Sequence, residues 1–277
     1  MKIRELLKKE IEKLNNNEVE DSIFKAKILL AFELEADMQY LNIHFDDEVG
    51  AEISRRFKED IQKVILGIPV QYITKHQEFY GLDFYVDENV LIPQPDTEIL
   101  VQEVIYLAKK FDRKPKIVDI CTGSGAIAIA VAKNIEAEIV ASDISEKGLQ
   151  IAKRNALENE VNIKFLQSDM FENIEEKFEI IVSNPPYIES QVIDTLSKEV
   201  RNEPIIALDG GNDGLDFYRI LAQNAKKYLS KNGILAVEIG YNQGKVVNKL
   251  FEDCGLVNVY TKKDFGGNDR IVVGKVE

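Results

Sequence analysis

Apolar residues recur every three or four positions through the first 70 residues, which is the spacing of amphipathic helices. This spacing predicts helices near residues 3–14, 22–34 and 47–66, with Ile23 among the inward-facing residues of the second. Gly67 is placed to end the third helix, and Pro69 cannot continue it. We therefore expect residues 1–75 to form a small helical bundle, and no cluster of catalytic residue types occurs within it.

From Phe79 onward the residues become aromatic and β-prone around a central Gly81. A β-hairpin is expected there, and residues 76–92 are interpreted as a hairpin linker between two domains. Asp96 follows as the expected cap of a helix over residues 99–111. That helix would open the second domain.

Residues 116–277 alternate short apolar runs with helical patterns. Strands are expected near residues 116–121, 138–142, 162–167, 178–183, 233–239, 256–262 and 269–274. Helices are expected near residues 125–134, 145–158, 214–230 and 242–253. Alternation of this kind is typical of an α/β fold whose sheet is mainly parallel and covered by helices on both faces. Residues 93–277 are thus predicted to form one domain around a seven-stranded sheet.

Composition limits the classes of protein that fit this pattern. The chain has 277 residues, of which 45% are hydrophobic, and its net charge of −13 argues against binding naked nucleic acid over its whole surface. Two scattered cysteines and only two histidines provide neither a disulfide framework nor an ordinary zinc site. The charged amino terminus lacks a signal-peptide core, and the longest apolar run, residues 126–132, falls far short of the roughly 20 residues that span a bilayer. We expect a cytoplasmic protein without membrane contact or a bound metal.

The stretch Asn184-Pro185-Pro186-Tyr187 directly follows an apolar run that is typical of a buried strand. Proline cannot continue a ladder, so the chain leaves the sheet at the carboxyl end of that strand, where open α/β sheets bind ligands. Asn184 offers an amide oxygen, a proline-rich turn leaves backbone carbonyls available, and Tyr187 offers a flat face. Two acceptors and a ring suit a planar NH₂ group, although a strand that ends in a plain proline-rich loop explains the same four residues.

A second group of polar residues follows three earlier strands. Cys121-Thr122-Gly123-Ser124-Gly125 leads into an Ala-rich helix, and its glycines allow the backbone to approach an anionic ligand closely. Asp143 ends the second strand, where an acidic side chain can bind two ribose hydroxyls. Met170 and Phe171 follow the third strand and are placed to line an adenine pocket, with Asp169 nearby. A G-x-G-x-x-A pattern from Gly123 also permits a dinucleotide, and tight turns or core packing explain each feature singly.

The combination of these features indicates the cofactor. Because the carboxyl ends of parallel strands meet at one edge of a sheet, we expect all of them to line one site. A nicotinamide-dependent oxidoreductase has no need of a planar-amine clamp and usually needs a proton-transfer residue, yet His44 and His76 both lie outside the sheet domain. Methyl transfer from S-adenosylmethionine fits better, since the sulfonium supplies the reactivity and the protein chiefly orients the acceptor.

Several stretches of the chain resemble a known family. Asn184–Tyr187, Ser124-Gly125 and Asp143 look like the amino-methyltransferases of the class I S-adenosylmethionine-dependent fold. Further stretches are similar to the PrmC/HemK family of peptide chain release factor glutamine methyltransferases; these are residues 67–73, 78–82, 91–98, 207–215 and 238–244. The resemblance implies a Rossmann-like domain that methylates N5 of the glutamine in the Gly-Gly-Gln motif of class 1 release factors. It also implies that the amino-terminal bundle contributes to release-factor recognition.

The residues and the resemblance together assign expected roles. Asn184, Pro185 and Tyr187 are expected to be catalytic, and with Pro186 they are expected to bind the substrate amide. The expected S-adenosylmethionine-binding residues are Cys121, Thr122, Gly123, Ser124, Gly125, Asp143, Asp169, Met170 and Asn184.

Four positions depart from the pattern of the family. The family commonly has Gly where Cys121 stands, Arg where Gln94 and Asn268 stand, and a bulky aromatic residue near Met170. Cys121 is small enough to keep the turn if its φ is negative, so cofactor binding is expected to survive. The loss of two positive charges leaves the fine contacts with the substrate open.

Two other functions remain compatible with the motifs. An adenine-N6 DNA methyltransferase also acts on a planar NH₂ group, but it must flip a base and hold phosphates. Most of the negative charge of the chain lies in residues 76–277, which disfavours that function. A non-enzymatic S-adenosylmethionine-binding protein would have no use for a clamp that includes the Asn184 oxygen and the Tyr187 ring. The preferred prediction is a monomeric enzyme that acts on release factors without direct contact with nucleic acid.

Overall fold

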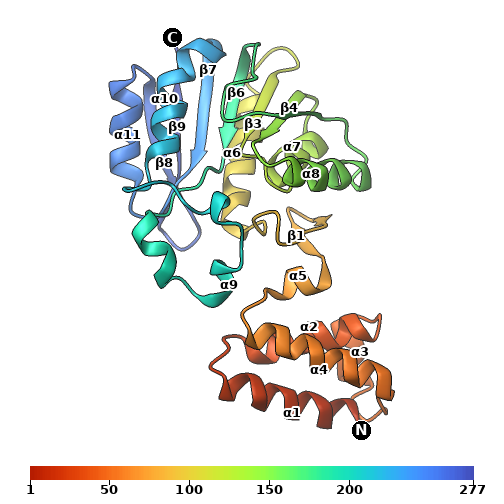
Figure 1. The fold of residues 1–277 in the computed structure, drawn as a ribbon. Coiled ribbons are helices and arrows are strands. Elements are labelled where there is room, and N and C mark those ends of the chain that lie inside the picture. Colours follow the sequence, from red (N-terminus) through yellow and green to blue (C-terminus); the bar gives the residue numbers. More distant parts are fainter. The chain divides into compact units, whose positions relative to one another are not determined.

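All of residues 1–277 are described by the computed structural model, in which the chain forms two compact units (Figure 1). One unit contains Met1–Lys75 and Leu196–Asn202, and the other contains His76–Thr195 and Glu203–Glu277. The sequence-based division placed Leu196–Asn202 in the sheet domain. This segment groups with the helical unit, where Asn202 Nδ2 donates to the Gly67 carbonyl (3.0 Å).

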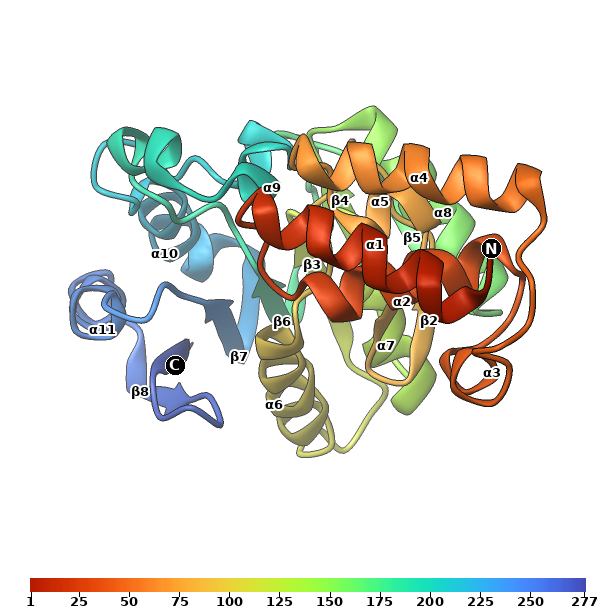
Figure 2. The same cartoon turned by 90° about the horizontal axis from the view of Figure 1, so that it is seen from below.

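The helical unit is built on three longer helices, α1 (Ile3–Asn16), α2 (Ser22–Glu33) and α4 (Ala51–Ile65), and α1 lies beside both of the others (Figure 2). The short helices α3 (Met38–Ile43), α5 (Val70–Thr74) and α9 (Lys198–Arg201) complete it, and none of these three was predicted. Two expectations were wrong in detail, because α4 begins at Ala51 instead of residue 47, and Ile23 is 58% exposed. Gly67 follows α4 with a φ of +92°, as expected of a glycine that ends a helix.

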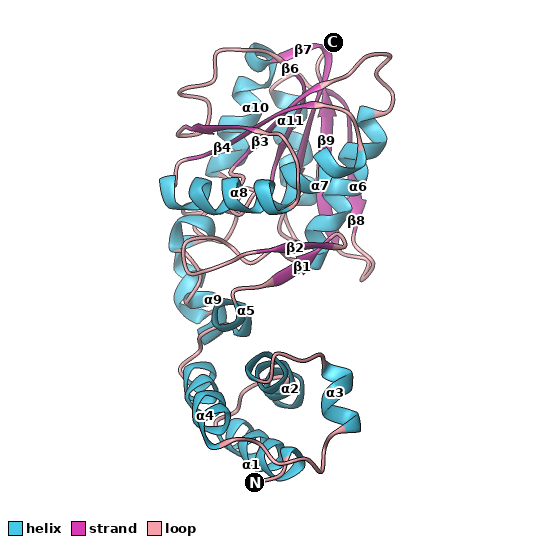
Figure 3. Cartoon of the chain, turned by 90° about the vertical axis from the view of Figure 1, so that its right-hand side faces the viewer, coloured by secondary structure: helices cyan, strands magenta, loops and turns pink.

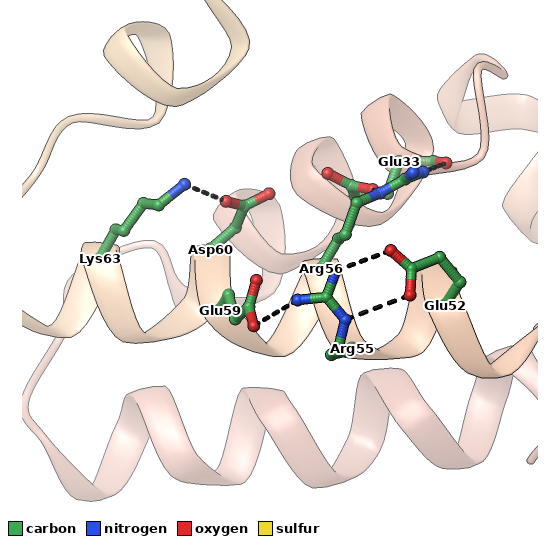
Figure 4. Close-up of polar contacts among 7 residues, drawn as sticks. All are labelled: Glu33, Glu52, Arg55, Arg56, Glu59, Asp60 and Lys63. Carbon is green, nitrogen blue, oxygen red and sulfur yellow. Dashed lines mark hydrogen bonds and ion pairs between the residues drawn. The ribbon is translucent and has the colours of Figure 1, made fainter.

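Several charged side chains of the helical unit form ion pairs with one another (Figure 4). Arg55 forms ion pairs with Glu52 (2.6 Å) and Glu59 (2.6 Å) along α4, and all three side chains are more than half exposed. Exposed helical pairs of this kind add little to stability, because solvent screens the charges. Arg56 reaches instead to Glu33 (2.5 Å), whose side chain is nearly buried, so this pair ties α4 to α2.

The second unit is organised around a seven-stranded sheet with the order β5-β4-β3-β6-β7-β9-β8. Its strands are β3 (Lys116–Ile120), β4 (Glu138–Asp143), β5 (Lys164–Gln167), β6 (Phe178–Ser183), β7 (Leu229–Glu238), β8 (Val257–Lys263) and β9 (Asp269–Lys275). Strands β3 to β7 are parallel, whereas β9 is antiparallel to both β7 and β8. The seven strands and the mainly parallel sheet were predicted correctly, although β7 begins at Leu229 instead of residue 233.

Helices pack on both faces of this sheet (Figures 1 and 3). On one face α6 (Glu98–Ala108) lies beside α7 (Ala126–Asn134), which lies beside α8 (Glu146–Glu158). On the other face α10 (Asp216–Tyr228) lies beside α11 (Gly244–Asp253). Strands β3 and β6 are buried along almost their whole length, which explains why both appear in the sequence as nearly continuous apolar runs.

In the segment before α6, one prediction is confirmed and another is wrong. The hairpin is present as β1 (Gln77–Phe79) and β2 (Leu82–Phe84), and its turn residues Tyr80 and Gly81 both have positive φ. Asp96 does not cap the following helix. It lies in a 3₁₀ turn over Pro95–Thr97, and its carboxylate forms an ion pair with the largely buried Arg270 (3.0 Å) instead.

The register of the parallel strands brings distant residues to one edge of the sheet. Ile120 of β3 pairs with Ser142 of β4 on one side and with Ser183 of β6 on the other. Asp143 at the end of β4 pairs with Gln167 of β5. The segments that follow these four strands are therefore neighbours in space.

Candidate functional site

The turn that follows β3 is shaped by two glycines with different surroundings. A Cβ atom on Gly125 (φ +83°) would lie 3.0 Å from Ile129 Cδ1 and 3.1 Å from the Cβ of Ala152, so the turn packs tightly against α7 and α8. A Cβ atom on Gly123 (φ +53°) would meet nothing within 4 Å. The backbone is thus fixed at Gly125 and open to a ligand at Gly123.

The carboxylate of Asp143 is oriented by backbone groups on both of its oxygens. Oδ2 accepts the N–H of Gly123 (2.8 Å), and Oδ1 accepts the N–H of Ser145 (2.8 Å). Burial raises the pKa of this carboxyl, while the two backbone hydrogen bonds oppose the increase. Because each carboxylate oxygen can accept more than one hydrogen bond, Asp143 is still able to accept two from a ligand over the turn.

A cavity of about 370 Å³, within the usual size range of ligand pockets, lies at this edge of the sheet. The residues of the predicted site that line it are Cys121, Gly123, Asp143, Asp169, Met170, Asn184 and Pro186. Those that do not line it are Thr122, Ser124, Gly125, Phe171, Pro185 and Tyr187. The structure therefore brings residues from the ends of four strands to one cavity, which is lined by only part of residues 121–125 and 184–187.

Other parts of the cavity wall were missed by the sequence analysis. Residues 89–91, which precede α6, form one part, and Ile206, Ala207 and Phe217 form an apolar part. Residues 205–207 lie in a 3₁₀ turn without a periodic signal, and Phe217 is one apolar position among several on α10. Only the path of the chain between β6 and β7 places them here.

Cys121 and Met170 adopt left-handed backbone conformations that the sequence did not reveal. Their φ values are +62° and +45°, and their sulfur atoms lie 3.8 Å apart. The condition of a negative φ, under which Cys121 was expected to keep the turn without strain, is therefore not met. A left-handed conformation costs a residue with a Cβ atom roughly 1–2 kcal/mol, a cost that glycine does not have, so Cys121 strains the turn.

Replacing Cys121 by valine is expected to lower the free energy of unfolding by about 1–3 kcal/mol, because a β-branched side chain is poorly tolerated at positive φ. Cys254 provides a matched control, since it is also half-buried but follows α11 with a φ of −81°. Urea denaturation of both valine variants measures the difference. Equal losses of stability would contradict the strain assigned to Cys121.

The Asn184–Tyr187 stretch leaves β6 as predicted and is held by neighbouring elements. Asn184 Nδ2 donates to Thr97 Oγ1 (3.3 Å), and the Tyr187 hydroxyl donates to Glu238 Oε1 (3.5 Å). Burial raises the pKa of Tyr187, which keeps its hydroxyl protonated at neutral pH. A Cβ atom on Gly210 would lie only 2.7 Å from Tyr187 Cα, so the loop before α10 packs directly against this stretch.

Two fully buried carboxyl groups lie close to the motifs of the site. Burial raises the pKa of Asp119 to about 7, although the Thr122 hydroxyl donates to it (2.6 Å) and opposes the increase. Burial also raises the pKa of Glu238 to about 7, against the opposing effects of Thr97 and Arg270. Both groups therefore titrate close to neutral pH.

The raised pKa of Asp119 couples folding to pH. A carboxyl with a pKa of about 7 in the folded state and 3.8 in the unfolded state holds its proton more tightly when folded, so its contribution to stability is lost as the pH rises through 7. The free energy of unfolding of the wild type is expected to fall between pH 5 and pH 8. In Asp119→Asn this fall is expected to be smaller by on the order of 2 kcal/mol. Urea unfolding at both pH values checks this, with Asp83→Asn as the control because the Asp83 side chain is 84% exposed. Parallel pH profiles for the wild type and Asp119→Asn would argue against a raised pKa.

No group of three or more His, Cys, Asp or Glu side chains is placed to hold a metal ion. None of the helices combines the length and the apolar content required to cross a membrane.

Comparisons of the sequence with known proteins find related methyltransferase sequences for both units. Residues 5–74 match the PrmC N-terminal domain, and residues 95–203 match the methyltransferase small domain. A release factor glutamine methyltransferase of Clostridium acetobutylicum is 40% identical over 280 residues, which cover 99% of this chain and 98% of that protein. One of Agrobacterium fabrum is 39% identical over 261 residues, which cover 92% of this chain and 90% of that protein.

Comparisons with solved structures concern the fold alone. A methyltransferase from Pyrococcus furiosus has a TM-score of 0.55 at 19% identity, covering 79% of this chain and 98% of that chain. The hMettl16 catalytic domain has a TM-score of 0.60 at 15% identity, covering 75% of this chain and 80% of that chain. The Rossmann-like class I methyltransferase fold predicted from the sequence is confirmed.

Proposed function

We propose, on the premise that this chain belongs to the family of release factor glutamine methyltransferases, that it methylates the glutamine of the Gly-Gly-Gln motif in class 1 peptide chain release factors. The methyl donor is S-adenosylmethionine, and the acceptor atom is the side-chain amide nitrogen, N5. The observation that carries the proposal is the position of Asn184 in the cavity wall. Its amide nitrogen is bonded to Thr97, so its oxygen is left to accept a hydrogen bond from a substrate.

The residues around the cavity suit S-adenosylmethionine, which supplies an electrophilic methyl group on its sulfonium. We assign the two ribose hydroxyls to Asp143, whose oxygens are already oriented by the backbone. We assign the methionine part to the open backbone at Gly123, within the turn formed by residues 121–125, and the adenine to Asp169 and Met170. These assignments use both the polar and the apolar walls of the cavity.

Asn184 and the residues after it are proposed to hold the glutamine amide in position. An amide nitrogen is a poor nucleophile because its lone pair is delocalised into the carbonyl. The Asn184 Oδ1 and the Pro185 carbonyl would accept its two N–H groups, with Pro186 and the ring of Tyr187 keeping the amide plane in place. Holding donor and acceptor roughly 3–3.5 Å apart in the correct alignment can supply several kcal/mol of the barrier.

The proposed reaction needs no strong base before methyl transfer. The nitrogen gains positive charge as the N–C bond forms and the S–C bond breaks, which makes its N–H protons acidic. One of these protons already points at Asn184 Oδ1 or at the Pro185 carbonyl in the proposed arrangement, and it leaves to solvent after the transfer. Orientation is therefore the main contribution of the chain.

The remaining parts of the proposal concern the whole protein. We assign residues 1–75 to recognition of the release factor, residues 76–92 to a linker and residues 93–277 to catalysis. We propose that the enzyme acts as a monomer in the cytoplasm, without direct contact with nucleic acid. Size-exclusion chromatography with light scattering tests the monomer, since a mass near twice 31.4 kDa would contradict it.

Transfer of a labelled methyl group from S-adenosylmethionine tests the proposed substrate class. The acceptors are a purified class 1 release factor and unmethylated duplex DNA, each supplied separately. Label on the release factor alone is the expected result. Label on DNA would instead support an adenine-N6 DNA methyltransferase, because the acceptors at Asn184 suit both kinds of planar NH₂ group.

A further inference from the structure

Thr97 is a buried polar residue beside the site whose hydroxyl is not used by its own helix. It immediately precedes α6, a position where threonine commonly caps the backbone, yet its side chain makes no capping hydrogen bond. It is only 4% exposed. Its Oγ1 instead accepts a hydrogen bond from Asn184 Nδ2 at 3.3 Å, between segments 87 positions apart in the sequence.

Glu238 supplies the reason for the direction of this hydrogen bond. It ends β7, which pairs in parallel with β6 so that Val237 lies opposite Ser183, the residue before Asn184. Thr97 is close enough to Glu238 for its hydroxyl to lower the pKa of that carboxyl. Glu238 Oε2 is buried without a hydrogen-bond partner of its own, which increases the demand of this group for donors.

These contacts determine which end of the Asn184 amide faces the cavity. Above its pKa of about 7 Glu238 is ionised, and a Thr97 hydroxyl that donates to it offers Asn184 only an oxygen lone pair. The Asn184 NH₂ group can donate a hydrogen bond to that lone pair. If the amide were turned over, Asn184 Oδ1 would lie against Thr97 Oγ1, and two acceptors would face each other. The amide oxygen is thereby kept on the other side, where Asn184 lines the cavity.

We propose that Thr97 is a positioning residue for methyl transfer, which holds the Asn184 amide in the orientation that presents Oδ1 to the substrate, with Glu238 directing the Thr97 proton. This inference rests on the proposed function. It adds two residues that do not line the cavity, Thr97 immediately before α6 and Glu238 at the end of β7.

Thr97→Val removes the hydroxyl while nearly keeping the volume, and Thr97→Ser keeps the hydroxyl. At pH 8.5 Thr97→Val is expected to lower kcat about 10–100-fold, with the KM for the release factor and the Kd for S-adenosylmethionine changed less than about threefold. Thr97→Ser is expected to recover kcat to within about threefold of the wild type. Thr261→Val is the matched control. Thr261 lies on β8, and its Oγ1 also accepts a hydrogen bond from an asparagine side chain, that of Asn248 (Nδ2, 2.8 Å). A wild-type kcat in Thr97→Val, or equal losses in Thr97→Ser and Thr97→Val, would overturn the inference.

The side-chain NH₂ resonances of Asn184 in a ¹⁵N-labelled protein provide a readout that needs no substrate. Thr97→Val is expected to shift the Asn184 NH₂ protons upfield, as loss of a hydrogen bond does, and Thr97→Ser is expected to leave them near the wild-type position. Unmoved resonances in Thr97→Val would overturn the inference even if methylation is observed. Failure of the wild type to methylate a release factor would instead contradict the proposed function, and the resonances would still test the hydrogen bond.

Discussion

Replacing Asn184 by alanine is expected to lower kcat on the order of 10²–10³-fold, while the Kd for S-adenosylmethionine changes by no more than about threefold. The side chain is proposed to accept an N–H of the substrate amide, and that hydrogen bond matters most when the nitrogen gains charge. Truncation removes the acceptor, whereas the ribose contacts assigned to Asp143 are untouched. Single-turnover kinetics and calorimetry measure the two quantities separately.

Asn248→Ala provides the control for this experiment. Asn248 donates to Thr261 Oγ1 (2.8 Å), so the variant loses the same kind of side-chain hydrogen bond in a different part of the fold. Its kcat is expected to equal that of the wild type. Normal turnover by Asn184→Ala would disprove the proposed clamp.

Replacing Asp143 by alanine is expected to raise the Kd for S-adenosylmethionine about 10–100-fold, since two hydrogen bonds to an ionised carboxylate are lost. The turnover number at saturating cofactor is expected to stay within about threefold of the wild type, because Asp143 does not contact the acceptor amide in the proposed arrangement. This separation of effects is the reverse of that expected for Asn184→Ala. Calorimetric titration and saturation kinetics measure it.

Asp143 also holds the backbone of Gly123 and Ser145, so a second variant is needed. Asp143→Asn keeps one acceptor oxygen and is expected to bind with an intermediate Kd. Asp83→Ala, which removes a largely exposed carboxylate, is the control for the loss of one negative charge. An unchanged Kd in Asp143→Ala would remove this residue from the ribose-binding role.

The strands of the sheet and the place of Asn184 could be predicted because local sequence determines both. Strands β3 and β6 are nearly continuous apolar runs, and the two prolines after Asn184 force the chain out of the sheet at a known edge. The residues after parallel strands then become neighbours by topology alone. For this reason Cys121, Gly123, Asp143 and Asn184 could be expected at one edge of the sheet, where they line the cavity.

The backbone strain and the polar contacts behind the site could not be predicted, because they depend on residues distant in the sequence. The positive φ of Cys121 follows from the path between β3 and α7, and no pattern in the turn distinguishes it from a negative φ. Asp96 has the composition of a helix cap, but Arg270, 13% exposed at the side chain, attracts its carboxylate. Glu238 comes close to Asn184 only because β7 lies beside β6. Thr97 contacts Asn184 from 87 positions away in the sequence.

The most direct test of the central claim is to locate the transferred methyl group by mass spectrometry. A class 1 release factor is incubated with this protein and S-adenosylmethionine, and the peptide that contains the Gly-Gly-Gln motif is fragmented. The account predicts one added methyl group on the side-chain nitrogen of that glutamine, and no methylation of a release factor whose glutamine is replaced by alanine. A methyl group on another residue, or equal labelling of the alanine variant, would contradict it.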